Sequence, residues 1–124
     1  LLGKQDYKEI ANLCDEVIGE IKTINEDDFQ KIQRPYKDYT LNEYINSMAF
    51  FKSQYRGDFI LEITILKGYN DNNDSIQKLK KIIQKISPDK IEIKKEEDKR
   101  LKKRLAITDE RLSEIKKEIL NTTL

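Results

Sequence analysis

The chain has 124 residues, of which 38% are charged and 37% hydrophobic, so it forms one domain at most, with enough apolar content for a core. Its 24 basic and 23 acidic residues nearly balance, which gives no overall field that favours nucleic acid or a membrane surface. With one cysteine, Cys14, and no histidine, the chain cannot form an internal disulfide, hold a cysteine-ligated cluster by itself or use imidazole chemistry.

The amino-terminal part predicts a short helix and then a strand. A capping box and apolar spacing indicate a helix over about residues 7 to 15, in which we expect Cys14 to be buried. Residues 17–22 follow as a strand with two different faces. The first face carries Ile18, Glu20 and Lys22, and the second carries Val17, Gly19 and Ile21.

Two helices are predicted between this strand and the next. Asn25 is placed to cap a short helix over 26–32, whose acidic first turn suits the helix dipole. A second capping box begins at Thr40 and starts a helix of about fifteen residues. Its apolar stripe, which includes several aromatic residues, indicates packing rather than a ligand site.

Residues 59–71, FILEITILKGYND, predict the central strand and a polar loop after it. One face of the strand is wholly apolar, whereas the other carries Glu62 and Thr64 at its centre. Ligands of α/β proteins bind at loops that follow the carboxyl ends of strands. The segment therefore indicates both a buried strand and a candidate site.

The rest of the chain predicts helix, strand and helix. Asp74 or Ser75 is expected to cap an amphipathic helix that ends at Ser87. Residues 90–94 form a short strand with isoleucines on one face and Glu92 and Lys94 on the other. Thr108 then caps the last helix.

Strands that alternate with amphipathic helices predict an α/β fold with right-handed crossovers and a parallel sheet of three strands. Each strand places polar residues opposite an apolar face, so the polar residues should share one side of the sheet. That side is either a lumen filled by water or ligand or a surface covered by a further part of the protein. Three strands make part of a (β/α) barrel and not a closed one.

The charge is unevenly spread along the chain. Residues 1–76 contain nine basic and fourteen acidic residues, whereas residues 77–104 contain twelve basic and five acidic ones. The run 94–104 is interpreted as a solvated loop or frayed helix, with a phosphate-binding patch as the alternative. RNA binding through 77–104 is disfavoured because no aromatic residue lies there for stacking.

Three segments, taken in order, resemble the carboxyl-terminal half of radical S-adenosylmethionine (radical SAM) enzymes. They are IKTINEDDFQKIQRP at 21–35, LEITILKGYND at 61–71 and SPDKIEI at 87–93. The similarity is to Fe-S oxidoreductases related to pyruvate formate-lyase activating enzymes and to wyosine-forming enzymes, and it covers about residues 1–119. The corresponding family motifs read iNRp, lvkGiND and pdkvqln; Gln33 stands where the family has Asn.

The resemblance implies half of a radical SAM barrel, with S-adenosylmethionine and substrate in the lumen. In the parent protein, a [4Fe-4S] cluster on a CxxxCxxC loop would cleave S-adenosylmethionine to a deoxyadenosyl radical. This chain lacks that motif. We therefore expect an Fe-S oxidoreductase as the parent enzyme, whose cluster-binding half is absent here, and an isolated chain that is inactive and binds neither cofactor.

The same resemblance implies two groups of site residues, all at or beyond the carboxyl halves of the strands. The cofactor-binding group is Lys22, Thr23, Glu62, Thr64 and Asn70. The substrate-binding group is Arg34, Lys67, Asp71, Glu92 and Lys94. The alternative for each is a structural role, since strand charges are often solvated and Asn and Asp are turn formers and helix caps.

A second function class is a non-catalytic binding or assembly domain that keeps the half-barrel shape and covers its open face by dimerisation. An exposed sheet edge and an open face favour association in either case. The expected partner is therefore the missing amino-terminal half of the barrel or a second copy of the chain. No apolar run approaches ~20 residues and no signal sequence is visible, so we expect a cytoplasmic protein.

Overall fold

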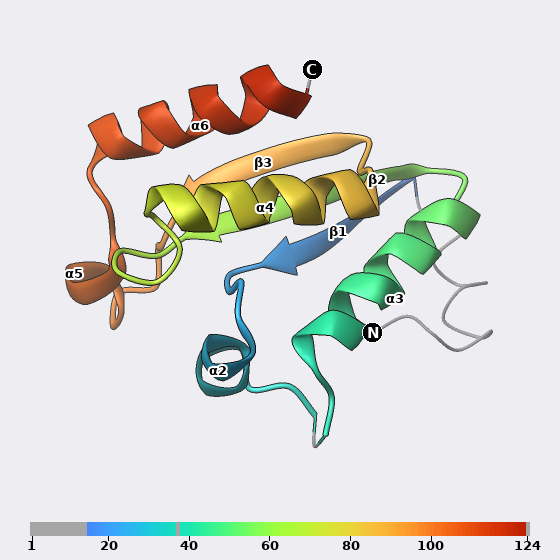
Figure 1. Ribbon diagram of the computed structural model, residues 1–124, viewed down its shortest axis with the longest axis horizontal. Helices are drawn as coiled ribbons and strands as arrows, with labels where there is room; N and C mark the ends of the chain where they lie inside the picture. Colours follow the sequence, from blue (N-terminus) through green and yellow to red (C-terminus); the bar gives the residue numbers. More distant parts are fainter. Residues whose placement is uncertain (1–14, 37, 124) are drawn as a thin grey trace.

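The computed structural model describes residues 15–36 and 38–123, so Cys14 and nearly all of the helix expected over 7–15 lie outside the described residues. Within them, three strands form one parallel sheet in the order β1 (Glu16–Ile21), β2 (Asp58–Ile65) and β3 (Lys90–Lys95). Helices lie between successive strands (Figure 1). The predicted partial α/β barrel with a parallel sheet is confirmed.

Three longer helices cover one side of this sheet. They are α3 (Leu41–Gln54), α4 (Asn73–Ile86) and α6 (Asp109–Thr123), and α4 lies between the other two over β2 (Figure 1). Two shorter helices, α2 (Glu26–Asp28) and α5 (Lys102–Leu105), belong to connections beyond the carboxyl ends of the strands. In the part of the chain that the structure describes, no helix is both long and apolar enough to span a membrane.

β2 is the middle strand of the sheet, and the side chains on its apolar face lie in the core. Phe59, Leu61, Ile63 and Ile65 are each at most 1% exposed. They share one cluster with Met48 and Phe51 of α3, Ile76, Leu79 and Ile83 of α4, and Ile115 and Ile119 of α6. Burial of one such side chain stabilises the fold by about 1.5–3 kcal/mol, so this side of the sheet is the packing side.

Gly19 allows α3 to approach β1 closely. A Cβ atom at this position would lie 2.7 Å from Cζ of Phe59 and 2.9 Å from Sδ of Met48. Real Cβ atoms essentially never come within 3.0 Å of another heavy atom. The glycine is therefore required by the packing between strand and helix, and β1 carries no side chain at the centre of its covered face.

The helix caps agree with the sequence except at α4. Thr40 Oγ1 accepts a hydrogen bond from the Glu43 amide, and Thr108 Oγ1 accepts one from the Arg111 amide, at 3.1 Å in both cases. At α4, however, the cap is Asn72, whose Oδ1 accepts from the Ser75 amide at 2.8 Å. The prediction of Asp74 or Ser75 is wrong because the helix begins one turn earlier than its first apolar residue suggests.

The short helix expected over 26–32 continues differently from the prediction. Asn25 caps α2 as expected, but the chain then winds into a π-helix, η1 (Phe29–Gln33), and Arg34 takes a left-handed conformation with φ 45° and ψ 62°. Single turns of π-helix often occur at functional sites. A non-glycine residue with positive φ is uncommon and costs about 1–3 kcal/mol, so the surrounding structure holds Arg34 in place.

Candidate functional site

The side of the sheet away from α3, α4 and α6, which no helix among the described residues covers, is called the uncovered side. It carries its side chains in rows, because partners in a parallel ladder point the same way. The first row pairs Ile18 of β1 with Ile60 of β2. The next aligns three carboxylates across the whole sheet, from Glu20 through Glu62 to Glu92. In the row beyond it, Thr64 lies beside Lys94. We call the five residues Glu20, Glu62, Glu92, Thr64 and Lys94 the polar face.

One ion pair joins two rows of the polar face. Lys94 Nζ lies 2.7 Å from Glu62 Oε1, and this hydrogen bond raises the pKa of Lys94, with smaller contributions from the nearby charges of Glu20 and Glu97. Glu62 is the more sheltered partner, whereas Lys94 is substantially exposed. The pair neutralises one of the three aligned carboxylates, so the row keeps a negative charge.

Thr64 has the most unusual environment on the polar face. The residue is 1% exposed, and its Oγ1 has no hydrogen-bond partner among the described residues. An unsatisfied buried hydroxyl costs about 1–3 kcal/mol and is rare in native proteins. Its neighbours on this side are the two residues of the ion pair, one along β2 and one across on β3. The hydroxyl is therefore a donor and acceptor that is buried and has no described partner, beside charged groups.

Asn70 and Thr23, both predicted to bind cofactor, use their polar atoms within the protein. Asn70 is fully buried; its Oδ1 accepts from the Leu66 amide, and its Nδ2 donates to the carbonyls of Lys22 and Thr64. Thr23 Oγ1 donates to Gln33 Oε1 at 2.6 Å. These contacts join the carboxyl ends of β1 and β2 to the loops that follow them. Both residues therefore hold in place the edge of the sheet that borders the predicted site.

Lys22 lies at the same edge as these two residues. Its Nζ is 3.9 Å from Glu96 Oε2, and Glu96 is 5% exposed although it is charged. The second Glu96 oxygen accepts a hydrogen bond from the Asp98 amide. The sequence did not indicate Glu96, because its position in the run 94–104 favoured a solvated residue.

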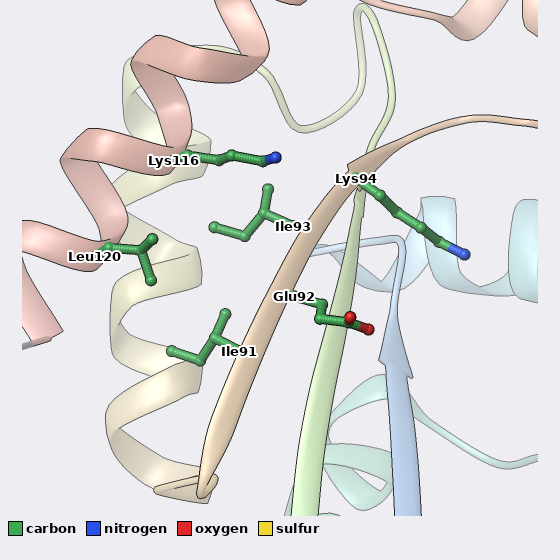
Figure 2. Close-up of a pocket in the computed structure, with 6 residues that line it drawn as sticks. All are labelled: Ile91, Glu92, Ile93, Lys94, Lys116 and Leu120. Carbon is green, nitrogen blue, oxygen red and sulfur yellow. The ribbon is translucent and has the colours of Figure 1, made fainter.

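Figure 2 shows how β3 separates polar from apolar side chains. Glu92 and Lys94 project on one side, over the neighbouring strands, and Ile91 and Ile93 project on the other, toward Lys116 and Leu120 of α6. A hollow of about 350 Å³ lies along this outer strand. Glu92 and Lys94 therefore belong with Glu62 and Thr64, as predicted, even though they also border the hollow.

The remaining predicted residues lie apart from the polar face. Lys67 and Asp71 line a hollow of about 180 Å³ beside the start of α6, where Arg111 donates to the Asp71 carbonyl. Arg34 lies instead in a larger cleft of about 560 Å³. Of the ten predicted residues, the structure groups Glu62, Thr64, Glu92 and Lys94 closely and places Lys22 at their edge.

The larger cleft brings Arg34 and part of the run 94–104, for which a phosphate-binding patch was the alternative, together with two residues that the sequence did not indicate, Lys31 and Tyr69. Besides Arg34, it is lined by Lys31 of η1, by Tyr69 of the β2–α4 loop, and by Arg100 and Arg104 of the β3–α6 connection. We call these five residues the basic cleft. The available signal was the excess positive charge of residues 77–104, but the aromatic ring comes from a distant loop.

Comparisons of sequence reach two curated proteins. The chain is 30% identical over 93 residues to GTPase Obg of Brachyspira hyodysenteriae, a match that covers 75% of the chain and 14% of that protein. It is 27% identical over 90 residues to UPF0026 protein MJ1312 of Methanocaldococcus jannaschii, covering 73% of the chain and 28% of that protein. The chain thus spans less than a third of either relative. No protein-family model matches it.

Solved structures show the fold. A domain of pyruvate-formate lyase-activating enzyme from Bacteroides vulgatus superposes with a TM-score of 0.73 at 13% identity, over 99% of this chain and 72% of that one. The chain has the fold of a radical SAM half-barrel. A radical SAM methyltransferase from Sphaerobacter thermophilus also superposes, with a TM-score of 0.60 at 13% identity, over 87% of this chain and 31% of that one.

A radical SAM barrel needs ligands for an iron-sulfur cluster, and the described residues do not fit one. The chain has a single cysteine, and within residues 15–36 and 38–123 no group of three Cys, Asp or Glu side chains could hold a metal ion. The row of Glu20, Glu62 and Glu92 is therefore a set of separate carboxylates. The carboxylates, Lys94 and the unpartnered Thr64 hydroxyl suit an organic ligand with polar and charged groups better than a metal cluster.

Proposed function

We propose that this chain is the carboxyl-terminal segment of a radical SAM Fe-S oxidoreductase and supplies one wall of its S-adenosylmethionine and substrate site. The observation that carries the proposal is the buried, unpartnered Thr64 hydroxyl next to three aligned carboxylates on the uncovered side of a radical SAM half-barrel. The packing side has no comparable unsatisfied side-chain atom among the described residues.

Charge indicates which part of the cofactor the polar face would contact. Like charges on adjacent strands, about 5 Å apart, repel one another, and Lys94 compensates only Glu62. Glu20 and Glu92 flank Glu62 on either side and keep their charges, so cationic groups placed over the row would reduce its net negative charge. S-adenosylmethionine carries a sulfonium and an ammonium group. An iron-sulfur cluster, when bound in the parent enzyme, would supply the electron that cleaves it. The chain's own residues would orient the cofactor and shield it from water.

The experiment compares S-adenosylmethionine with S-adenosylhomocysteine, which lacks the sulfonium charge, in titrations of the protein encoded by the whole reading frame. We expect the cationic ligand to bind more tightly, and Glu20→Gln with Glu92→Gln to remove most of that preference. Lys78→Gln with Lys81→Gln, two exposed changes on α4, is the control. Equal binding of the two ligands by the unaltered protein would contradict the proposed contact.

The isolated 124-residue chain gives the complementary measurement. Because part of the site would be missing, calorimetry with S-adenosylmethionine should show weak binding at most and no cleavage. Tight binding with a stoichiometry near one would mean that the chain holds a complete site. A reading frame that begins at or just before Leu1, without a CxxxCxxC sequence, would rule out the radical SAM enzyme.

A second candidate function is an assembly domain that dimerises through the uncovered side of the sheet. Ile18 favours it, because its side chain is 54% exposed and lies in one row with Ile60. Under this proposal the partner is a second copy; under the first it is the amino-terminal half of the barrel. Sedimentation over a concentration series distinguishes the two functions. A dimer that Ile18→Lys dissociates supports the assembly domain, and a monomer at all concentrations opposes it.

A further inference from the structure

We propose that the basic cleft is a binding site for a nucleotide, with phosphate held by its cations and the base stacked on Tyr69. This site is separate from the polar face, and the inference does not depend on the proposed radical SAM function. The cleft has a volume of about 560 Å³, within the roughly 300–1,000 Å³ range of small-molecule sites.

The lining of the cleft has one sign of charge. Lys31, Arg34, Arg100 and Arg104 contribute cations, Tyr69 and three aliphatic side chains complete it, and no acidic residue lines it. Among the described residues, Lys31, Arg34 and Arg104 form no ion pair, and Arg100 has only a 3.5 Å contact with Asp98. Three cations without a balancing carboxylate, beside a fourth that is paired with Asp98, attract an anion, and guanidinium groups are especially suited to phosphate.

A rigid frame holds the three segments that form the cleft. The Lys67 amide donates to the Leu105 carbonyl at 2.8 Å, which joins the β2–α4 loop to α5. Gln33 Oε1 accepts from Thr23 Oγ1, which ties the end of η1 to the end of β1. Each connection follows the carboxyl end of a strand (Figure 1). The fold therefore brings the backbone segments that carry these cations together at one edge of the sheet.

Backbone strain supports a specific role for Arg34. Its left-handed conformation follows directly after the π-helix that carries Lys31. Such strain persists where the surrounding structure requires it and often marks ligand sites. The conformation turns the chain so that residues on both sides of the π-helix end line one cleft.

Tyr69 distinguishes a nucleotide from a simple anion. Its ring lines the cleft among the cations, and a base stacked on an aromatic side chain contributes about 1–3 kcal/mol to binding. A nucleotide satisfies both features, whereas inorganic phosphate satisfies only the charge. The ligand is either a free mononucleotide or one nucleotide of a single RNA strand, because both present a phosphate and a base.

The test titrates the 124-residue chain with AMP, adenosine and inorganic phosphate. We expect AMP to bind more tightly than either of the others. Arg34→Glu with Arg104→Glu should weaken AMP binding at least about tenfold, the effect of losing one charge-assisted hydrogen bond. Tyr69→Leu should weaken AMP about fivefold but leave phosphate within about twofold, because only the base stacks on the ring.

Two controls keep the result interpretable. Lys78→Glu with Lys81→Glu makes the same change in net charge on an exposed face of α4 and should leave AMP binding unchanged. Lys31→Glu with Arg100→Glu avoids the strained position and should reproduce the loss seen with the first pair. AMP binding no tighter than phosphate binding, or an equal loss in the α4 control, would overturn the nucleotide site.

A labelled eight-nucleotide RNA distinguishes the sources. Binding that is much tighter than that of AMP and falls steeply with salt would assign the site to an RNA strand. Binding no tighter than that of AMP would assign it to a free mononucleotide. Absence of binding by AMP and RNA alike would overturn the proposal.

Discussion

The two sides of the sheet differ although they share the same strands. Along β2, Leu61 and Ile63 on the covered side are fully buried in the core, and Glu62 and Thr64 alternate with them on the other side. On the covered side, the apolar residues pack against three helices. On the uncovered side, carboxylates stand in a row, and one buried hydroxyl has no partner among the described residues.

This difference separates residues that build the fold from residues that are free to bind. Packing on the covered side is complete without a ligand, so changes there should reduce stability. The polar face bears like charges at close range and an unsatisfied hydroxyl, which do not stabilise the isolated chain. Changes on it should have small effects on stability and large effects on binding.

The largest expected effect is on the covered side. Ile63→Ala should lower the free energy of unfolding by about 2–5 kcal/mol, because it leaves a cavity at a fully buried position. Chemical denaturation measures the change, and Ile63→Val should cost only about 0.5–1.5 kcal/mol. A loss below 1 kcal/mol for the alanine variant would contradict the placement of Ile63 in the core.

The next largest loss of stability is expected for Asn70→Ala. This variant tests the edge of the sheet that borders the polar face and the basic cleft. It removes three hydrogen bonds and leaves the Leu66 amide and two carbonyls without this partner. We expect a loss on the order of 3 kcal/mol, about 1 kcal/mol for each bond. If Asn70 instead served mainly as a ligand contact, stability would hardly change, and thermal denaturation would show it.

The contact between Tyr44 of α3 and Glu20 of β1 can be tested by the pH dependence of stability. Its hydroxyl donates to the Glu20 carbonyl at 2.7 Å, and burial raises the pKa of Tyr44 to about 12. An unfolded tyrosine has a pKa near 10, so this stabilisation is fully present below pH ~10 and is lost as the pH rises toward 12. The loss should amount to roughly 2–3 kcal/mol.

Tyr44→Phe is the control for this titration. The variant should be less stable near neutral pH by about 1 kcal/mol, because it lacks the hydrogen bond, and its stability should decline less between pH 10 and 12. Unfolding curves at several pH values measure both effects. Parallel decline of the two proteins would show that other groups cause the alkaline loss.

The smallest effect on stability is expected on the polar face. Glu62→Leu removes one partner of a partly exposed ion pair, a contribution of about 0.2–1 kcal/mol, and also relieves repulsion from Glu20 and Glu92. Stability of the isolated chain should therefore change by less than about 1 kcal/mol. Unchanged activity of the parent protein with this variant would identify Glu62 as merely exposed.

Local patterns in the sequence predicted the strands and the packing side well. Alternation in 59–66 assigned Leu61 and Glu62 to opposite faces, and the register then aligned Glu62 with Glu20 and Glu92. Such features depend on neighbours in the chain and on the period of a strand. The same local signals predicted the cap of α3, which depends on residues three positions apart.

Features that depend on distant residues were not predictable in the same way. Asn70 looked like a turn former or a ligand contact, and only the fold shows that it reaches the carbonyl of Lys22, 48 residues earlier. A phosphate-binding patch was the alternative for the basic run that contains Arg100 and Arg104, but the sequence did not show that Tyr69, from another loop, lies beside it. Charge counting along a chain does not show which segments meet at one edge.

The measurement that most directly tests the difference between the two sides is Thr64→Val. The change keeps the shape of the side chain but removes the unpartnered hydroxyl. We predict that the 124-residue variant is at least as stable as the unaltered chain, while the protein from the whole reading frame binds S-adenosylmethionine more weakly. A clear loss of stability together with unchanged binding would show that Thr64 belongs to the packing and that the polar face is not a site.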